Sequence, residues 1–364
     1  MAFILFRRAR LVKLISSSIL DRLVEAFEIE VDRTDEVMAS GQSCKIFRVG
    51  GFPSDCEVYI VDSDAGKEVA CHPSIVGDRL AKLCLEMALD AVKAILEFTP
   101  LREYARDSIV FEHVLRAAPG YRLHEALRDA GLDFREVWVR PRYVTPSYRD
   151  HDEEAAKRLV IVYEDFSNLP ENRDLMVVKP DTEASGRTGE IALKRLARFA
   201  EEKGCKLEEL IIYGFISEPG LKAIYEVAKE LGFKRIYAFA IGDLTALCYN
   251  MYDMPLYGPD ESYYAERGEI RNLGGVADYT TLERYVPEFI PGADQPGDWS
   301  ARQVRVFTGT GYEPGGIPKH LKNSIELIER LWKLSRDMDW FMDFHEHAIK
   351  RELEALRNEL KKWV

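Results

Sequence analysis

The sequence lacks any long uninterrupted hydrophobic segment. No stretch approaches the roughly 18 apolar residues of a membrane-spanning helix. The most apolar early segment, residues 1–20, is interrupted by Arg7, Arg8, Arg10 and Lys13 and has no hydrophobic core of the signal-peptide type. We therefore expect a cytoplasmic protein with no membrane partner.

Paired cysteines and net positive charge are also lacking. The six cysteines are irregularly spaced and none forms a Cys-x-x-Cys pair, which disfavours a zinc site and a disulfide framework. Lys and Arg total 50 against 62 Asp and Glu, which gives a formal net charge of −12. Such a chain has no overall attraction to nucleic acid, so we expect no nucleic-acid partner. A few arginines can still converge on a small phosphorylated ligand.

Apolar material is plentiful, and its distribution predicts the fold class. Hydrophobic residues make up 46% of the 364 residues, enough for a full core. Within residues 71–308, short apolar runs alternate with helix-like stretches, which predicts a mostly parallel sheet covered on both faces. Residues 1–70 are typical of a small α+β addition, and residues 309–364 of a charged helical tail.

One segment carries most of the chemical information. The apolar run 175–178 leads into Asp181 and Glu183, and the small-residue turn 184–189 then opens a helix. In such a turn the backbone N–H groups and hydroxyls converge at a helix N-terminus, which suits a phosphomonoester. The two carboxylates are suited to hold sugar hydroxyls or a hydrated Mg²⁺. A plain strand-to-helix turn with an N-cap is the alternative.

The segment resembles the 5-phosphoribosyl 1-diphosphate (PRPP) motif of type I phosphoribosyltransferases. In that family an acidic pair precedes a turn of the form small-Thr-Gly-x-Thr, and Pro180-Asp181 and residues 184–188 hold these places here. Pro180 is a departure from the motif, as are Thr182 and Glu183 at usually apolar positions. The resemblance implies that PRPP is bound by Ala117, Thr182, Glu183, Ala184, Ser185, Gly186, Arg187, Thr188 and Gly189.

Three further stretches resemble the uracil phosphoribosyltransferase branch, in the same order along the chain. Arg116-Ala117 matches a peptide, often cis, that faces the pyrophosphate, and Arg149 matches an arginine that contacts PRPP. Residues 289–299 resemble the uracil-binding segment, although the usual chain ends soon after it. This match implies base-binding roles for Ile290, Pro291, Gly292, Pro296 and Gly297, and catalytic roles for Arg116, Arg149, Asp181 and Asp298.

The resemblance implies a three-layer fold of the type I phosphoribosyltransferase class and an enzyme of pyrimidine salvage. It would transfer the phosphoribosyl group of PRPP to a nucleobase, uracil first, with Mg²⁺ bound through PRPP and water rather than by direct protein ligands. A homodimer or larger homo-oligomer is expected. The alternative is a PRPP- or nucleotide-sensing protein on the same fold without turnover, and a weaker one is a scaffolding role for the C-terminal helix.

Several other residues receive structural interpretations. His345 and His347 are two apart on a helix, which makes shared metal ligation difficult, so we expect a solvated face. His113 in an apolar run is typical of a core histidine, and His72 is treated as structural. The Gly-rich residues 309–318 follow no predicted strand and are expected to be a linker.

Overall fold

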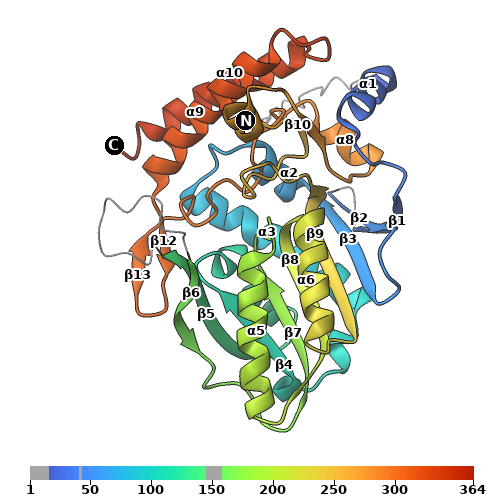
Figure 1. Ribbon diagram of the computed structural model, residues 1–364, viewed down its shortest axis with the longest axis vertical. Helices are drawn as coiled ribbons and strands as arrows, with labels where there is room; N and C mark the ends of the chain where they lie inside the picture. Colours follow the sequence, from blue (N-terminus) through green and yellow to red (C-terminus); the bar gives the residue numbers. More distant parts are fainter. Residues whose placement is uncertain (1–15, 41–42, 145–157) are drawn as a thin grey trace, which may run out of the picture.

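One nine-stranded sheet organises the chain (Figure 1). The computed structural model describes residues 16–40, 43–144 and 158–364. In spatial order the strands are β1 (Thr34–Ser40), β2 (Cys44–Val49), β3 (Cys56–Ser63), β9 (Arg235–Thr245), β8 (Lys206–Ser217), β7 (Asp174–Pro180), β4 (Ile109–Val114), β5 (Arg135–Val144) and β6 (Arg158–Asp165). The strands from β3 to β5 are parallel, whereas β1, β2 and β6 pair antiparallel at the two edges. The predicted mostly parallel α/β sheet is therefore confirmed.

Helices connect and cover these strands. They are α1 (Ser17–Phe27), α2 (Asp64–Cys71), α3 (Gly77–Phe98), α4 (Leu123–Asp129), α5 (Arg187–Glu202), α6 (Glu218–Glu230), α7 (Glu261–Arg267), α8 (Tyr279–Tyr285), α9 (Ile317–Ser335) and α10 (Asp343–Leu360). The described residues also contain short 3₁₀ turns at η1 (Pro100–Glu103), η2 (Arg106–Ser108) and η3 (Ala118–Tyr121). No helix among the described residues is long and apolar enough to cross a bilayer.

The sheet forms the middle of three layers because its side chains alternate between two cores. On β7, Met176 and Val178 join a core that also contains α2, α3 and α4. Leu175 and Val177 point the other way, into the core formed with α5 and α6. Burial on both faces explains why the parallel strands are continuous apolar runs rather than alternating ones.

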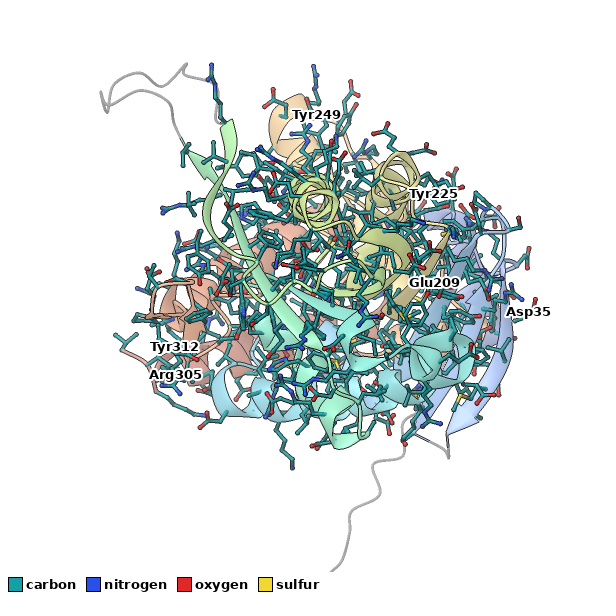
Figure 2. The ribbon with its side chains drawn as sticks, turned by 90° about the horizontal axis from the view of Figure 1, so that it is seen from below. Asp35, Glu209, Tyr225, Tyr249, Arg305 and Tyr312 are labelled. Carbon is teal, nitrogen blue, oxygen red and sulfur yellow. The ribbon has the colours of Figure 1, made fainter. Side chains whose placement is uncertain are left out.

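The N-terminal strands extend this same sheet. β3 pairs with β9 in parallel, with Val58 opposite Ala238, and the boundary expected at residue 70 falls inside α2. Figure 2 shows Asp35 of β1 at one edge of the molecule and Arg305 and Tyr312 at the opposite edge.

The region after β9 contains several short regular elements. Besides α7 and α8 it holds two small antiparallel pairs, β10 (Tyr257–Pro259) with β11 (Asn272–Gly274) and β12 (Arg305–Phe307) with β13 (Tyr312–Pro314). β13 lies within residues 309–318, so the linker expected there is partly a hairpin. The region between β9 and α9 thus consists of short elements that pack near the ends of the central strands (Figure 1).

The C-terminal tail is a pair of helices packed on the rest of the chain. α9 and α10 share a core with Val76 and Ile290, so their apolar positions are covered within the same chain. The solvated face expected for His345 is wrong: its Nδ1 accepts from the Met342 N–H at 3.1 Å and its Nε2 lies 3.2 Å from the Tyr257 hydroxyl. His347, two residues on, is exposed, because residues two apart face different sides of a helix.

Candidate active site

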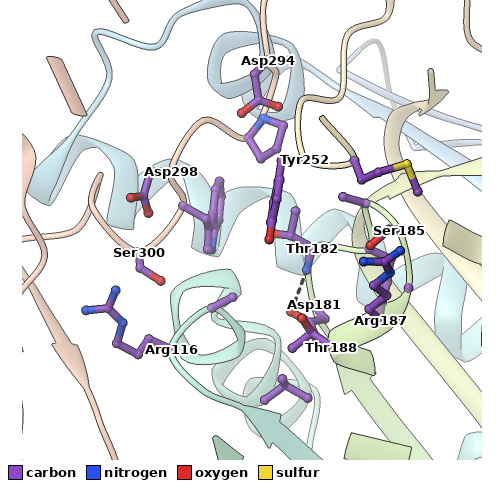
Figure 3. A pocket seen from close by; sticks show the side chains of 18 of the residues that line it. Arg116, Asp181, Thr182, Ser185, Arg187, Thr188, Tyr252, Asp294, Asp298 and Ser300 are labelled. Atoms are coloured by element: carbon purple, nitrogen blue, oxygen red, sulfur yellow. Dashed lines mark hydrogen bonds between the residues drawn. The ribbon is translucent and has the colours of Figure 1, made fainter. Parts of the chain in front are cut away.

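A cavity of about 480 Å³ opens where β4 and β7 end. The two strands are parallel neighbours, so the segments that follow them meet at one edge of the sheet. Arg116 and Ala117 come from the first segment and residues 181–188 from the second (Figure 3). Residues between 294 and 300, together with residues 251–253, close the opposite side. The structure thus brings together most of the residues singled out from the sequence.

The turn at residues 184–188 lines one end of the cavity throughout. Gly186 has a φ of +75°, a region that favours glycine, and an added Cβ would lie 3.0 Å from the Gly220 carbonyl oxygen. The turn therefore sits tightly on the start of α6. α5 begins at Arg187, so the unpaired N–H groups and positive end of its first turn lie at the cavity. This arrangement suits a phosphate dianion.

Gly189, unlike residues 184–188, lies away from the cavity. It does not line the cavity, and an added Cβ would lie 2.5 Å from Glu183 Oε1 and 2.6 Å from Ile224 Cδ1. The missing side chain makes room for Glu183 beneath the turn rather than for a ligand.

A buried cluster of one ammonium and three carboxyl groups supports the turn. Lys179 Nζ donates to Asp181 Oδ2 at 3.1 Å and to Glu183 Oε1. Glu112 on β4 is fully buried nearby, and neither of its carboxyl oxygens has a hydrogen-bond partner among the described residues. Burial raises the pKa of Glu112 to about 8 and that of Glu183 to about 7. The cluster therefore retains protons near neutral pH, while Lys179 fixes Asp181 at the cavity wall.

An aromatic wall, Tyr121 stacked on Trp299, joins the two sides of the cavity. The Tyr121 and Thr182 hydroxyls lie 2.5 Å apart, and the Tyr121 ring stacks on Trp299 with centroids 4.4 Å apart. Thr182 and Trp299 both line the cavity, so the two segments that meet there are joined through Tyr121.

Arg116, which follows β4, places a cation at the cavity. Its guanidinium is partly exposed and lies 3.8 Å from Glu313, so a competing anion can replace this weak contact. The cis peptide bond joins Leu115 to Arg116, one bond before the Arg116-Ala117 peptide that the resemblance implied.

Carboxylates dominate the other end of the cavity. Asp294 Oδ1 accepts from the Met254 N–H at 2.8 Å and Asp298 Oδ1 from the Ala301 N–H at 3.1 Å. Burial, together with neighbouring Asp253, raises the pKa of Asp294 well above its usual range. In Figure 3, Asp294 and Asp298 lie on the side away from Arg187 and Thr188. This end therefore suits a neutral or donor-rich group rather than a phosphate.

The predicted base-binding segment divides in two. Pro296, Gly297 and Asp298 line the cavity, whereas Ile290, Pro291 and Gly292 do not. Ile290 is buried in the core shared with α9 and α10, and an added Cβ on Gly292 would lie 2.6 Å from Leu331 Cδ2. The Ile-Pro-Gly part thus packs against the tail.

Arg149 lies outside the described residues. Among those that are described, the sequence interpretation missed several cavity residues: Tyr143, Met251, Tyr252, Asp253, Asp294, Trp299 and Ser300. Asp294 and Trp299 fall inside the segment already singled out, so its polar and aromatic members were the available signal. Tyr252 and Asp253 belong to the Tyr-rich residues 249–264, a composition that is also typical of packing.

His113 and His72 make contacts that are typical of structural residues. His113 is fully buried with its Nε2 3.0 Å from Glu136, as expected of a core histidine, although its Nδ1 has no hydrogen-bond partner among the described residues. Within the described residues, Glu68, His72 and Glu288 form the group of three potential metal ligands close enough to share an ion, and none lines the cavity. Although burial opposes its charge, hydrogen bonds to Glu288 and Glu352 raise the pKa of His72 to about 9. A protonated imidazole is a poor ligand, which favours an ion-pair network here.

Comparisons with known proteins give a limited result. No family model matches the chain, and a search of curated proteins found no match. Among solved structures, the AQ2163 protein from Aquifex aeolicus is 18% identical with a TM-score of 0.37, covering 54% of this chain and 91% of its own. Adenine phosphoribosyltransferase from Trypanosoma brucei is 13% identical with a TM-score of 0.33, covering 53% and 85%. Purine phosphoribosyltransferase from Pyrococcus horikoshii is 16% identical with a TM-score of 0.26, covering 43% and 86%.

Two of these structures are phosphoribosyltransferases, the family that the sequence resembles, and their names refer to adenine and purine rather than uracil. Identity and TM-score are too low for the likeness to carry a functional argument. The functional proposal therefore rests on the residues of the cavity.

Proposed function

We propose that this protein transfers the phosphoribosyl group of PRPP to a nucleobase and releases pyrophosphate. Uracil is the first base to test, because the sequence resemblance points to it. The observation that supports the proposal most is the shared cavity: a turn suited to a phosphate and a buried carboxylate from one chain segment face the same space as an arginine from another segment. Each part matches one group of PRPP.

In this proposal the 5′-phosphate occupies the turn at residues 184–188, where α5 begins. Asp181 accepts hydrogen bonds from the ribose hydroxyls, with its carboxylate held in place by Lys179. Arg116 neutralises the pyrophosphate, giving up its long contact to Glu313. Asp298 and the adjoining residues orient the base at the carboxylate-rich end.

The reaction is a displacement at C1 of the ribose. The bond from C1 to the pyrophosphate oxygen breaks, a bond from C1 to a base nitrogen forms, and the proton on that nitrogen passes to a carboxylate or to water. Positive charge develops on the ribose ring as the leaving group departs. Catalysis then rests on positioning and on electrostatic stabilisation, with no covalent nucleophile.

The donor set fits a Mg²⁺ ion that arrives with PRPP. Asp181 and Glu183 are already engaged by Lys179, so they suit the ion's water shell or sugar hydroxyls better than direct ligation. When bound, the ion would neutralise charge on the pyrophosphate.

The test is base-dependent release of pyrophosphate. The protein is incubated with PRPP, saturating Mg²⁺ and each of uracil, cytosine, adenine, guanine and hypoxanthine in turn. We expect release with one base or a small subset. Absence of release with all five bases would remove the proposal.

A second candidate is a sensor that binds PRPP or a nucleotide without turnover. Pro180 at one acidic position and the Lys179 contact to Asp181 leave fewer free carboxylates than the family motif provides, which favours this reading. Calorimetric binding of PRPP without any release of pyrophosphate would support it.

A further inference from the structure

A second hollow, of about 210 Å³, adjoins the carboxylate-rich end of the cavity. The two spaces have Asp253, Asp294, Gly297 and Asp298 as common lining residues, so they lie side by side. The far wall of the hollow belongs to α9, the first helix of the C-terminal tail. The tail therefore reaches the site that the sequence resemblance assigned to the base.

α9 is held against this site by close contacts. An added Cβ on Gly297 would lie 2.8 Å from His320 Cε1, so only a glycine leaves room for the helix. His320 Nε2 donates to the Pro73 carbonyl oxygen at 2.9 Å, and burial lowers the pKa of His320 to about 4, which keeps the ring neutral. Pro73 itself lines the hollow.

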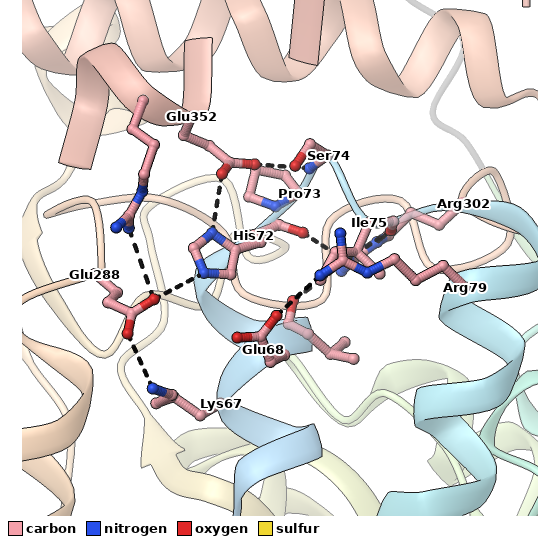
Figure 4. Close-up of polar contacts among 12 residues, drawn as sticks. Lys67, Glu68, His72, Pro73, Ser74, Ile75, Arg79, Glu288, Arg302 and Glu352 are labelled. Atoms are coloured by element: carbon pink, nitrogen blue, oxygen red, sulfur yellow. Dashed lines mark hydrogen bonds and ion pairs between the residues drawn. The ribbon is translucent and has the colours of Figure 1, made fainter. Parts of the chain in front are cut away.

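α10 contacts the segment that contains Pro73, residues 72–74. Glu352 accepts from the Ser74 N–H at 2.8 Å, and its other oxygen lies 2.9 Å from His72 Nδ1 (Figure 4). His72 Nε2 lies 3.1 Å from Glu288, so the imidazole bridges two carboxylates. Residues 72–74 and α9 consequently keep one geometry around the hollow.

The chemistry of the hollow suits a flat, neutral ring with polar edges. Leu327 and Ile328 supply apolar surface, whereas Asn323 and Ser324 supply neutral hydrogen-bonding groups. Asp253 and Asp294 face the same space, and their carboxyl oxygens accept hydrogen bonds. A carboxamide both donates and accepts, which matches the paired donor and acceptor on the edge of a nucleobase.

We propose that α9 forms the specificity wall of the acceptor subsite, with Asn323 pairing with the edge of the base and Asp294 accepting one of its N–H groups. This inference rests on the proposed function, since it places the base opposite the phosphate turn. It makes the C-terminal tail, which the family pattern lacks, part of the ligand site. Asn323 is a specificity-determining residue.

The test compares two substitutions of the same kind. Asn323→Asp replaces the amide donor with a second acceptor at the hollow, and Asn358→Asp makes the same change on α10, where exposed Asn358 accepts from Lys361. Calorimetry measures the affinity of the wild type and both variants for ribose 5-phosphate, UMP, CMP, AMP and GMP. Binding is the readout, so the result does not depend on turnover.

We expect Asn323→Asp to weaken the preferred nucleotide by about 10-fold, the equivalent of one lost hydrogen bond. The affinity for ribose 5-phosphate should remain unchanged, as should all affinities of Asn358→Asp. Nucleotide affinities and base preference that are equal in the two variants would overturn the inference while leaving the proposed function intact. If the wild type binds neither ribose 5-phosphate nor any nucleotide, the proposed function fails, and this inference with it.

Discussion

The phosphate side and the acceptor side of the cavity are built in different ways. The phosphate side comes from one continuous segment that leaves β7 and enters α5, whereas the acceptor side combines residues 251–253, residues 294–300 and α9. A single strand-turn-helix unit fixes its geometry locally. The acceptor side depends instead on how a long connection and a C-terminal tail pack over the sheet. In the proposed function, phosphate recognition is therefore a local property of this chain, and base recognition is a property of its tertiary structure.

The largest effect should come from removing the cation beneath the phosphate turn. Lys179→Met leaves Asp181, Glu183 and Glu112 buried without a compensating charge, so we expect a loss of about 3 to 5 kcal/mol in the free energy of unfolding at pH 8. Urea denaturation measures it. Lys194→Met is the matched control, because Lys194 also pairs with a glutamate four residues away, but on the surface. Equal losses in the two variants would show that the buried cluster does not support the turn.

The next largest effect should come from removing Arg116, the cation proposed to neutralise the pyrophosphate. Arg116→Ala should lower kcat/KM for PRPP by about 100- to 1000-fold, as expected when an electrostatic stabiliser of the leaving group is lost. Steady-state pyrophosphate release measures it, and Arg106→Ala, whose side chain pairs with Asp133 on the surface, is the control. An unchanged kcat/KM in Arg116→Ala would separate this arginine from the reaction.

A smaller effect concerns the dependence of stability on pH. The pKa of buried Glu112 is raised to about 8, so the folded state holds a proton that the unfolded state has already released. The stabilising effect of that proton is complete below the ordinary carboxyl pKa and is lost as pH rises towards 8. The free energy of unfolding should therefore decrease between pH 5 and pH 8, and Glu112→Gln should flatten the decrease. Glu97→Gln, at an exposed position, should retain the wild-type slope; a slope unchanged in Glu112→Gln would contradict the assignment.

The smallest effect tests the wall that joins the two sides. Tyr121→Phe keeps the stacking on Trp299 but removes the hydroxyl beside Thr182, so we expect a loss of about 1 kcal/mol in the free energy of unfolding. KM for PRPP and for the base should both rise, because Thr182 and Trp299 belong to opposite sides. Tyr225→Phe, which removes a surface contact to Asp55, is the control. A change in only one of the two KM values would show that the sides are not coupled through this wall.

Local sequence was sufficient for the sheet and for the turn at residues 184–188. The apolar runs, the small residues and the helix start lie within one stretch, so pattern and propensity point to the same structure. The outcome for Gly189 and Glu183 could not be predicted in that way, because their positions depend on Lys179 beneath the turn and on Ile224 of α6.

The acceptor side was predictable only in part. Gly297 and Asp298 were singled out, but the burial of Ile290 and Gly292 depends on α9 and α10, which follow later in the chain. His345 was misassigned for the same reason, since its partner Tyr257 lies in another element. Periodicity identifies a helix and does not indicate which other element covers it.

The most direct test of the central claim is a calorimetric titration with PRPP and Mg²⁺. The wild type is compared with a Ser185→Ala, Thr188→Val double variant, which removes two hydroxyl donors from the phosphate turn and leaves its backbone intact. We predict one site per chain in the wild type and an affinity at least about 10-fold weaker in the double variant. Absence of PRPP binding, or the same affinity in both proteins, would contradict the account.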